Sequence, residues 1–258
     1  MDLTGRNYEL YASCDLSFTE PFSSYEQTWR ILEAYEQALA QRQMSLTNNT
    51  IRTWLYVSDI DNQYQGMADA RREFFENCGM TKDTHFIAST GIAGQTARPR
   101  TIVSMDALSI SNIVPEQVTQ LSAPTHLNPT HEYGVTFERG TKVAFGDRTH
   151  YYISGTASID KYGEVIHVND IEKQTYRTIE NINSLLLPEG RSINDMAYLL
   201  VYLRDPTHFT YVRDVLETVV DRRIPRLYLK ARVCRPAWLV EIEAFGVKDA
   251  STSFPEFI

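Results

Sequence analysis

The most regular pattern of polar and apolar positions lies near the end of the chain, between residues 239 and 244. Apolar Val240, Ile242 and Ala244 alternate there with Glu241 and Glu243, which is typical of a β-strand with one buried face. Four arginines stand close before this run: Arg223, Arg226, Arg232 and Arg235. Carboxylates beside guanidinium groups are typical of an acid/base site for an anionic substrate. They are also typical of a solvated edge strand, and this pattern alone favours the edge strand.

Three short blocks recur in the same order along the chain, which indicates an internal duplication. Gln-Thr-Trp-Arg-Ile-Leu-Glu at 27–33 returns as Gln-Thr-Tyr-Arg-Thr-Ile-Glu at 174–180. Tyr-Val-Ser-Asp at 56–59 corresponds to Tyr-Leu-Arg-Asp at 202–205, and Val-Ser-Met-Asp-Ala at 103–107 corresponds to Val-Glu-Ile-Glu-Ala at 240–244. The offsets are 147, 146 and 137 positions, so we predict two copies with a shorter late loop in the second.

Both copies show the same succession of strand and helix patterns. In the second copy we expect a hairpin, a helix, a strand, a helix and two strands, at residues 133–144 with 150–159, 171–187, 196–203, 209–220, 226–231 and 238–245. In the first copy we expect the same elements without the opening strand, at residues 8–16, 24–43, 50–57, 63–77, 85–88 and 100–108. The ββαβαββ order predicts an α+β fold, with helices covering one face of a largely antiparallel sheet.

The segment between the copies is rich in Pro, Ser, Asn and Thr, which is typical of a surface linker. We therefore predict a first copy at residues 1–110, a linker at 111–130 and a second copy at 131–250.

Composition and charge narrow the classes of function. The net charge of −8 over 258 residues argues against nucleic acid or an anionic membrane as the main partner. Three scattered cysteines favour neither a disulfide framework nor a cysteine-rich zinc site, and no stretch resembles a signal peptide or a membrane span. His126 and His131 lack an acidic partner in helical register, so we expect no metal. We expect a cytoplasmic protein without a cofactor.

A second candidate segment is the small-residue turn Ser154-Gly-Thr-Ala-Ser158 at the end of an aromatic strand pattern. Small residues at a strand end let a ligand approach the backbone N–H groups. The other interpretation is a bulge or a tight turn without a ligand.

Together with the helix that follows it, this segment carries a resemblance to a known family. The runs Ile153-Ser-Gly-Thr-Ala-Ser158, His167-Val-Asn-Asp170 and Gln174-Thr-Tyr-Arg-Thr-Ile-Glu-Asn-Ile182 resemble the RidA (YjgF) superfamily. The resemblance implies that Arg226 binds a substrate carboxylate and that Glu241, fifteen residues later, orders the reacting water. It also implies sites between subunits that pack as trimers around a closed barrel, so we expect a homotrimer with six copies.

The duplication and the run Val233-Cys-Arg-Pro with Leu239-Val-Glu-Ile-Glu243 are similar to the chorismatase branch of that superfamily. This resemblance implies that Glu241 protonates the methylene carbon of an enolpyruvyl ether. Cys234, seven residues before Glu241, is similar to the subfamily that forms an aromatic product, whereas Ala157 is similar to the hydrolysing one. The product therefore stays open.

The residues by themselves also favour Glu241 as the acid. A glutamate among apolar neighbours on a strand has its ionised form disfavoured by desolvation, so its pKa rises toward neutral pH. In the repeat, Glu243 corresponds to Asp106, which indicates a structural role, whereas Glu241 corresponds to Ser104. The acid is thus particular to the second copy, and the first copy is expected to supply walls.

Other candidate residues have two interpretations each. Gly155, Thr156 and Ala157 either line the pocket or form a turn. Cys234 is either reactive, if the nearby arginines lower its pKa, or a small buried apolar group. Arg139 is either a second carboxylate clamp or a surface charge of the hairpin.

These observations support three hypotheses about function. The first is a chorismatase-like enzyme that cleaves or hydrolyses an enol on a small carboxylate-bearing substrate. The second is an enamine/imine deaminase that releases a 2-keto acid and ammonia. The third is a non-catalytic protein that binds a carboxylate metabolite. A structural or ribonuclease-like role is disfavoured because the chain is acidic.

Overall fold

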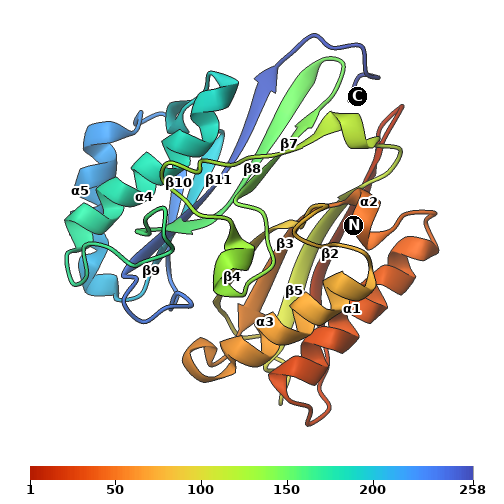
Figure 1. The fold of residues 1–258 in the computed structure, drawn as a ribbon, viewed down its shortest axis with the longest axis horizontal. Helices are drawn as coiled ribbons and strands as arrows, with labels where there is room; N and C mark the ends of the chain where they lie inside the picture. The colour runs from red at the N-terminus through yellow and green to blue at the C-terminus, as the bar shows by residue number, and fades with distance from the viewer. Residues whose placement is uncertain (258) are drawn as a thin grey trace.

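The computed structural model describes residues 1–257. They form two α+β units that lie side by side, with the helices on the outside and the sheets between them (Figure 1). The helix-free faces of the two sheets meet, because side chains of both units pair across the space between them. Within these residues no helix is both long and apolar enough to cross a membrane.

The first unit is a five-stranded sheet covered by two long helices. The sheet order is β1-β2-β5-β3-β4, with bounds Asp2–Thr4, Glu9–Ser17, Val103–Ile110, Thr50–Val57 and Ala88–Ala93. The helices are α1 (Ser24–Ala40) and α3 (Ile60–Asn77), with the short α2 (Leu46–Asn49) between them in the chain. Helix α1 begins at a capping box formed by Ser23 and Glu26. Their side chains accept hydrogen bonds from backbone N–H groups that have no partner within the first helical turn.

The second unit repeats this plan with one more strand. Its order is β10-β9-β11-β8-β7-β6, with bounds Arg226–Lys230, Tyr198–Leu203, Val240–Asp249, Arg148–Ala157, Gly140–Ala144 and Val118–Gln120. Its helices are α4 (Ile171–Leu186) and α5 (Phe209–Val219). Asp170 caps α4 by accepting from the Lys173 N–H, as the sequence predicts.

Strand register confirms the duplication. In the first unit Val57 of β3 lies opposite Val103 of β5, and in the second Leu203 of β9 lies opposite Val240 of β11. One residue further, Tyr56 lies opposite Ser104 and Tyr202 opposite Glu241. The matched blocks of the sequence therefore occupy the same places in the two sheets.

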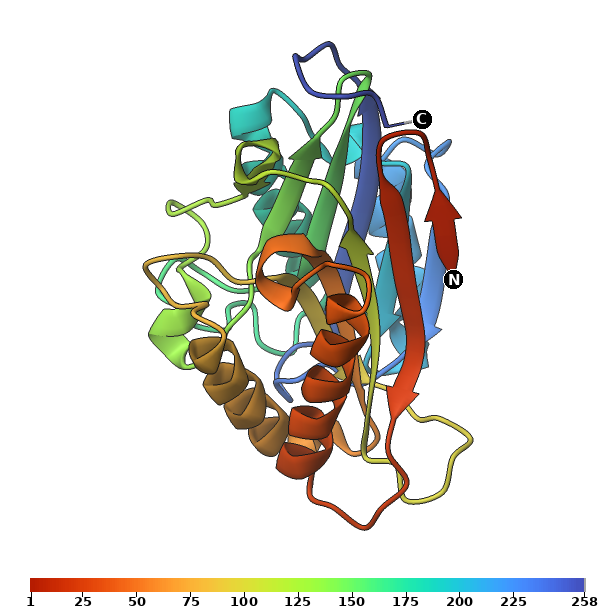
Figure 2. The same ribbon diagram turned by 90° about the vertical axis from the view of Figure 1, so that its right-hand side faces the viewer.

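Three predicted elements differ from the structure. The first unit does have an opening strand, the three-residue β1, which forms an edge hairpin with β2 (Figure 2). Its closing strand β4 spans Ala88–Ala93 and not residues 85–88. The hairpin of the second unit begins at Gly140 and not at residue 133, because the preceding segment leaves its own sheet: Glu138 forms a bridge with Ala88 of the other unit.

The segment 111–130 is more than a surface connection. Its residues 118–120 form β6, which pairs antiparallel with β7, and its Leu121 and Leu127 are buried. The domain boundaries 1–110, 111–130 and 131–250 stay a prediction.

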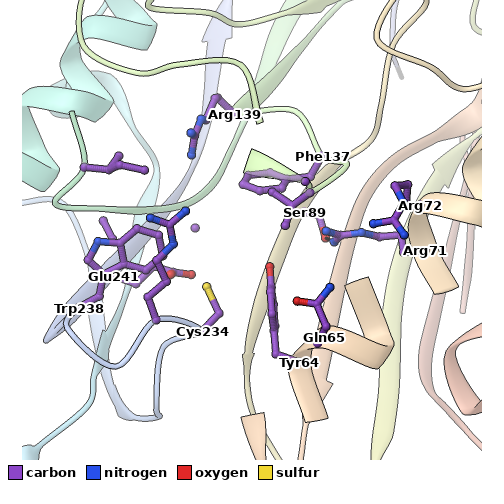
Figure 3. Close-up of a pocket in the computed structure, with 17 residues that line it drawn as sticks. Tyr64, Gln65, Arg71, Arg72, Ser89, Phe137, Arg139, Cys234, Trp238 and Glu241 are labelled. Atoms are coloured by element: carbon purple, nitrogen blue, oxygen red, sulfur yellow. Dashed lines mark hydrogen bonds between the residues drawn. The ribbon is translucent and has the colours of Figure 1, made fainter. Parts of the chain in front are cut away.

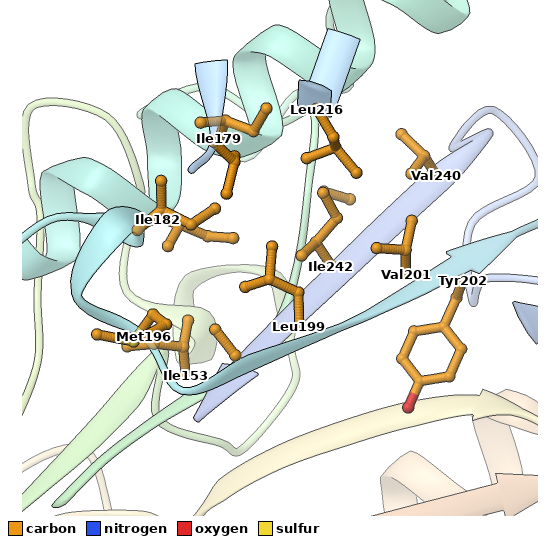
Figure 4. Close-up of a cluster of buried hydrophobic side chains, with 14 of the residues drawn as sticks. Ile153, Ile179, Ile182, Met196, Leu199, Val201, Tyr202, Leu216, Val240 and Ile242 are labelled. Carbon is orange, nitrogen blue, oxygen red and sulfur yellow. The ribbon is translucent and has the colours of Figure 1, made fainter. Parts of the chain in front are cut away.

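The core of the second unit places β11 in a fixed orientation. Figure 4 shows Ile242 of β11 and Leu199 of β9 directed toward Ile182 of α4, whereas Tyr202 points away from the helices. Because side chains alternate along a strand, Glu241 and Glu243 lie on the face opposite to Ile242, toward the first unit.

This packing predicts a large stability cost for Ile242→Ala. The side chain is fully buried, so its truncation leaves a cavity and lowers the free energy of unfolding by about 2–5 kcal/mol. Urea denaturation followed by circular dichroism measures the change. Val247→Ala on the same strand, where the side chain is 37% exposed, serves as the control and should change stability far less. Equal effects of the two variants would contradict the core assignment.

Candidate functional site

A cavity of about 340 Å³ lies between the two units. Figure 3 shows Glu241, Cys234 and Trp238 of the second unit on one side of it, and Tyr64, Gln65, Arg71 and Arg72 of helix α3 on the other. Phe137 and Arg139, from the segment that bridges to β4, also line it. The remaining lining residues are Ser89, Gly91, Gly134, Val135, Gly155, Ala157, Ile159 and Arg235. Neither unit forms this cavity alone.

Glu241 is buried at the cavity wall, where 4% of its surface is exposed. It lies opposite Tyr202 of β9 and Ala157 of β8. Its carboxyl group rests on Gly155, so closely that a Cβ atom there would lie 2.0 Å from Oε1. Glycine at this position is therefore needed for the carboxyl to take its place.

Burial dominates the titration of Glu241. Desolvation raises its pKa from 4.5 to about 8, and the negative charge of Glu243 adds to the shift, while Arg52 and Arg139 oppose it. The carboxyl group therefore carries a proton at neutral pH. A protonated carboxyl in a cavity is suited to donate a proton to a bound molecule.

The cavity is otherwise rich in positive charge. Arg71, Arg72, Arg139 and Arg235 line it, and 2% of Arg71 and 7% of Arg139 are exposed. Both Arg71 and Arg139 lie against the ring of Phe137, with guanidinium carbons 5.8 Å and 5.4 Å from its centre. Guanidinium groups bind planar carboxylates by paired hydrogen bonds, so the cavity is suited to a small anion.

The structure brings most of the predicted site residues together. Glu241, Gly155, Ala157, Cys234 and Arg139 all line the cavity. The surface-charge interpretation of Arg139 does not fit its burial.

Thr156 does not line the cavity. It is buried and lies opposite Ile242, and its hydroxyl donates to the Ser154 carbonyl oxygen at 2.9 Å. Since neighbouring residues of a strand point to opposite faces, Thr156 is directed to the helix side of the sheet.

Contrary to the prediction, Arg226 does not line this cavity either. It lies opposite Leu199 on β9, whereas Glu241 lies opposite Tyr202 from the other side of that strand. Three residues along a strand are about 10 Å, and two strand spacings add about 10 Å across the sheet. The Arg226 guanidinium instead donates to the carbonyl oxygen of Asp221 at 2.8 Å. The spacing of fifteen residues does not bring the two side chains together here.

Cys234 fits the apolar interpretation. Burial raises the pKa of its thiol to about 12, and the Glu241 carboxyl adds to the shift. The thiol therefore stays protonated at neutral pH, which does not suit a nucleophile.

The sequence did not indicate which residues of the first unit line the cavity. It predicted only that the first unit supplies walls of the site. A signal was present in α3, where Arg71 stands on the same helical face as Met67, Phe74 and Phe75. An arginine in an apolar stripe is unusual for a helix that only covers a sheet. Among residues 1–257, no group of three or more His, Cys, Asp or Glu side chains is arranged to hold a metal ion.

Comparison with known proteins agrees with this architecture. The family model described as endoribonuclease L-PSP matches residues 142–248. A RutC family protein of Pyrococcus abyssi is 32% identical over 100 residues, which make up 38% of this chain and 78% of that protein. The 3-aminoacrylate deaminase RutC of Acinetobacter baylyi is 29% identical over 92 residues, which make up 35% of this chain and 73% of that protein.

A similar fold extends over both units. The crystal structure of a chorismatase covers 95% of this chain and 78% of its own, with a TM-score of 0.77 and 20% sequence identity. Fold and cavity thus define a class of α+β proteins built from two like units with a ligand-sized cavity between them. The chain belongs to the RidA (YjgF) superfamily, which includes the RutC family proteins.

Proposed function

We propose that this protein is an enzyme that protonates an enol ether on a small, carboxylate-bearing substrate of the chorismate type. The observation that carries the proposal is the burial of Glu241 in a cavity lined by arginines, which raises its pKa to about 8. The similarity of fold to a chorismatase over nearly the whole chain supports it.

Each step of the proposed reaction uses groups of the cavity. The arginines, Arg139 and Arg71 foremost, hold the substrate carboxylates and fix the enol ether against Glu241. Glu241 gives its proton to the terminal methylene carbon, and the C=C electron pair forms the new C–H bond. The adjacent carbon then carries an oxocarbenium charge and takes up water. One proton of the attacking water returns to the Glu241 carboxylate, which leaves a hemiketal. The hemiketal then breaks its C–O bond to the ring as its hydroxyl proton passes to the departing oxygen, which gives pyruvate and an alcohol.

A second candidate reaction is the deamination of an enamine or imine, because one relative is a 3-aminoacrylate deaminase. The same carboxyl group would protonate the enamine carbon, and water would then displace ammonia from the resulting iminium group. A third alternative, of another class, is binding of a carboxylate metabolite without turnover.

One experiment separates the three. The protein is incubated with chorismate and, separately, with 3-aminoacrylate, and pyruvate and ammonia are measured. Pyruvate from chorismate supports the proposal, and ammonia release from the enamine alone supports the deaminase. Saturable binding of chorismate in calorimetry without any product would support the binding protein, the third alternative, and would exclude the proposed reaction.

The oligomeric state belongs to the same proposal. We expect three chains to associate, and sedimentation equilibrium measures this directly. A mass equal to one chain would contradict the homotrimer. It would not affect the cavity, because both walls of the cavity belong to one chain.

A further inference from the structure

A buried ion pair joins the two units behind the cavity. Arg52 of β3 donates from Nη2 to Oε2 of Glu243 on β11 at 2.7 Å, and the two side chains are 2% and 5% exposed. The Trp54 indole N–H donates to the other oxygen of Glu243 at 2.9 Å. Glu243 is thus held by two residues of the first unit, and both partners of the ion pair are shielded from water.

The ion pair is connected to the place where Glu241 rests. The Thr90 hydroxyl of β4 contacts both Arg52 and Glu243 and accepts from the Gly155 N–H at 2.9 Å. The Glu241 carboxyl group lies against Gly155. A continuous set of contacts therefore runs from the cation of the first unit to the acid of the second.

Glu241 and Glu243 are also neighbours on the same face of β11. They lie opposite Tyr202 and Leu200 in a regular register with β9, so about 7 Å of strand separates them on one face. Both are 4% exposed. Since the solvent screens little at this depth, the two opposite charges of the Arg52–Glu243 pair each act strongly on the neighbouring carboxyl group.

We propose that the Arg52–Glu243 ion pair is a positioning element of the site: through the balance of its two charges it sets the protonation state of Glu241. The negative charge of Glu243 favours the protonated form of Glu241, and the cation Arg52, supplied by the first unit, offsets part of this effect. The inference adds residues to the site and rests on the proposed function only in treating Glu241 as the acid.

The other groups around Glu241 are neutral or positively charged, and Arg139 among them also lowers its pKa. Tyr202 on β9 and Cys234 before β11 stay neutral, because burial raises the pKa of each. Positive charge comes from Arg139 of the bridging segment, from Arg71 and Arg72 of α3, and from Arg235. Glu243 supplies negative charge at close range, and Arg52 is its partner.

The test is a direct titration of Glu241 by NMR in protein labelled with ¹³C at the glutamate carboxyl carbon, with the Glu241→Gln variant assigning the signal. Glu243→Gln removes a negative charge and leaves Arg52, so the pKa of Glu241 should fall by about 1 unit or more. Arg52→Gln removes the cation, so the pKa should rise. The double variant should return closer to the wild-type value than either single variant, and Arg52→Lys, which keeps the charge, should stay near it.

The matched control is Lys248→Gln, which removes a charge from the same strand β11 at a site paired with Asp195. It should leave the titration of Glu241 unchanged. If Arg52→Gln does not fold, Glu243→Gln and the double variant decide. An unchanged pKa of Glu241 in these folded variants overturns the inference.

This readout is independent of turnover. If the protein converts no substrate but shows the expected titration, the proposed function is contradicted and the inference is supported. A protein that is active but shows an unchanged titration keeps the function and loses the inference.

Discussion

Replacement of Glu241 by glutamine should lower kcat for chorismate cleavage by about 10²–10⁴-fold, the usual contribution of a general acid. The glutamine amide keeps the shape of the side chain but has no acidic proton to give. In the wild-type protein the proton is present below a pKa of about 8, so activity should decline as pH rises through that value. Steady-state kinetics of both proteins between pH 6 and about 10 measure these effects. A variant as active as the wild type would exclude Glu241 as the acid.

The same variant provides its own control for folding. The folded-state pKa of Glu241 is raised above its ordinary value of 4.5, so the folded protein holds a proton that the unfolded chain releases. Its contribution to stability is present below about pH 4.5 and is lost as pH rises toward 8, by at most about 1.4 kcal/mol per pH unit. Glu241→Gln lacks this titration, so its free energy of unfolding should decline less over that range. Loss of activity without loss of stability then identifies a chemical role.

Gly155→Ala should also abolish most of the activity, although it changes no chemical group of the cavity. The added Cβ atom would lie 2.0 Å from Oε1 of Glu241 and 3.1 Å from a methyl carbon of Thr90. The buried carboxyl group must therefore move, and a displacement of about 1 Å at a reacting group costs on the order of 10²-fold in rate. We expect this loss in kcat, with a smaller change in KM because the arginines keep their places.

Gly91→Ala is the matched control for this prediction. Gly91 lines the same cavity from β4 of the first unit, but a Cβ atom there would only meet Tyr64 at 3.4 Å and Met67 at 3.6 Å, which is ordinary contact. The variant should keep most of the wild-type activity. If both alanine variants behaved alike, the close packing of Glu241 on Gly155 would not be what the reaction depends on.

The fold could be predicted largely because its signals are local. The alternation at residues 240–244 depends on which face of one strand is buried, and the capping of α4 by Asp170 depends on neighbours in the chain. Repetition adds long-range information: matching blocks predicted two like sheets, and the shared register of β3–β5 and β9–β11 confirmed them. The predicted bounds were wrong for segments that form β-bridges with the other unit. Glu138, which bridges to Ala88, is the clearest of them.

The candidate site divides in the same way. Glu241, Gly155 and Cys234 stand on segments of one unit, and pattern and resemblance indicated them. The resemblance also indicated Arg226, through its spacing of fifteen residues from Glu241, but spacing along the chain does not determine on which strand of a sheet a side chain comes to lie. Arg71 and Arg52 were missed, because their roles arise only where the two units meet.

The sequence by itself thus determined two α+β copies and an acid particular to the second, because hydrophobic period and repetition are properties of the chain. Only the tertiary structure decided which cations surround that acid. Arg71, Arg72 and Arg52 come from α3 and β3 of the first unit, and Arg139 and Arg235 come from the second. Their closeness to Glu241 results from the packing of the two units, which no local pattern describes. The burial that raises the pKa of Glu241 has the same origin, since desolvation depends on both walls of the cavity.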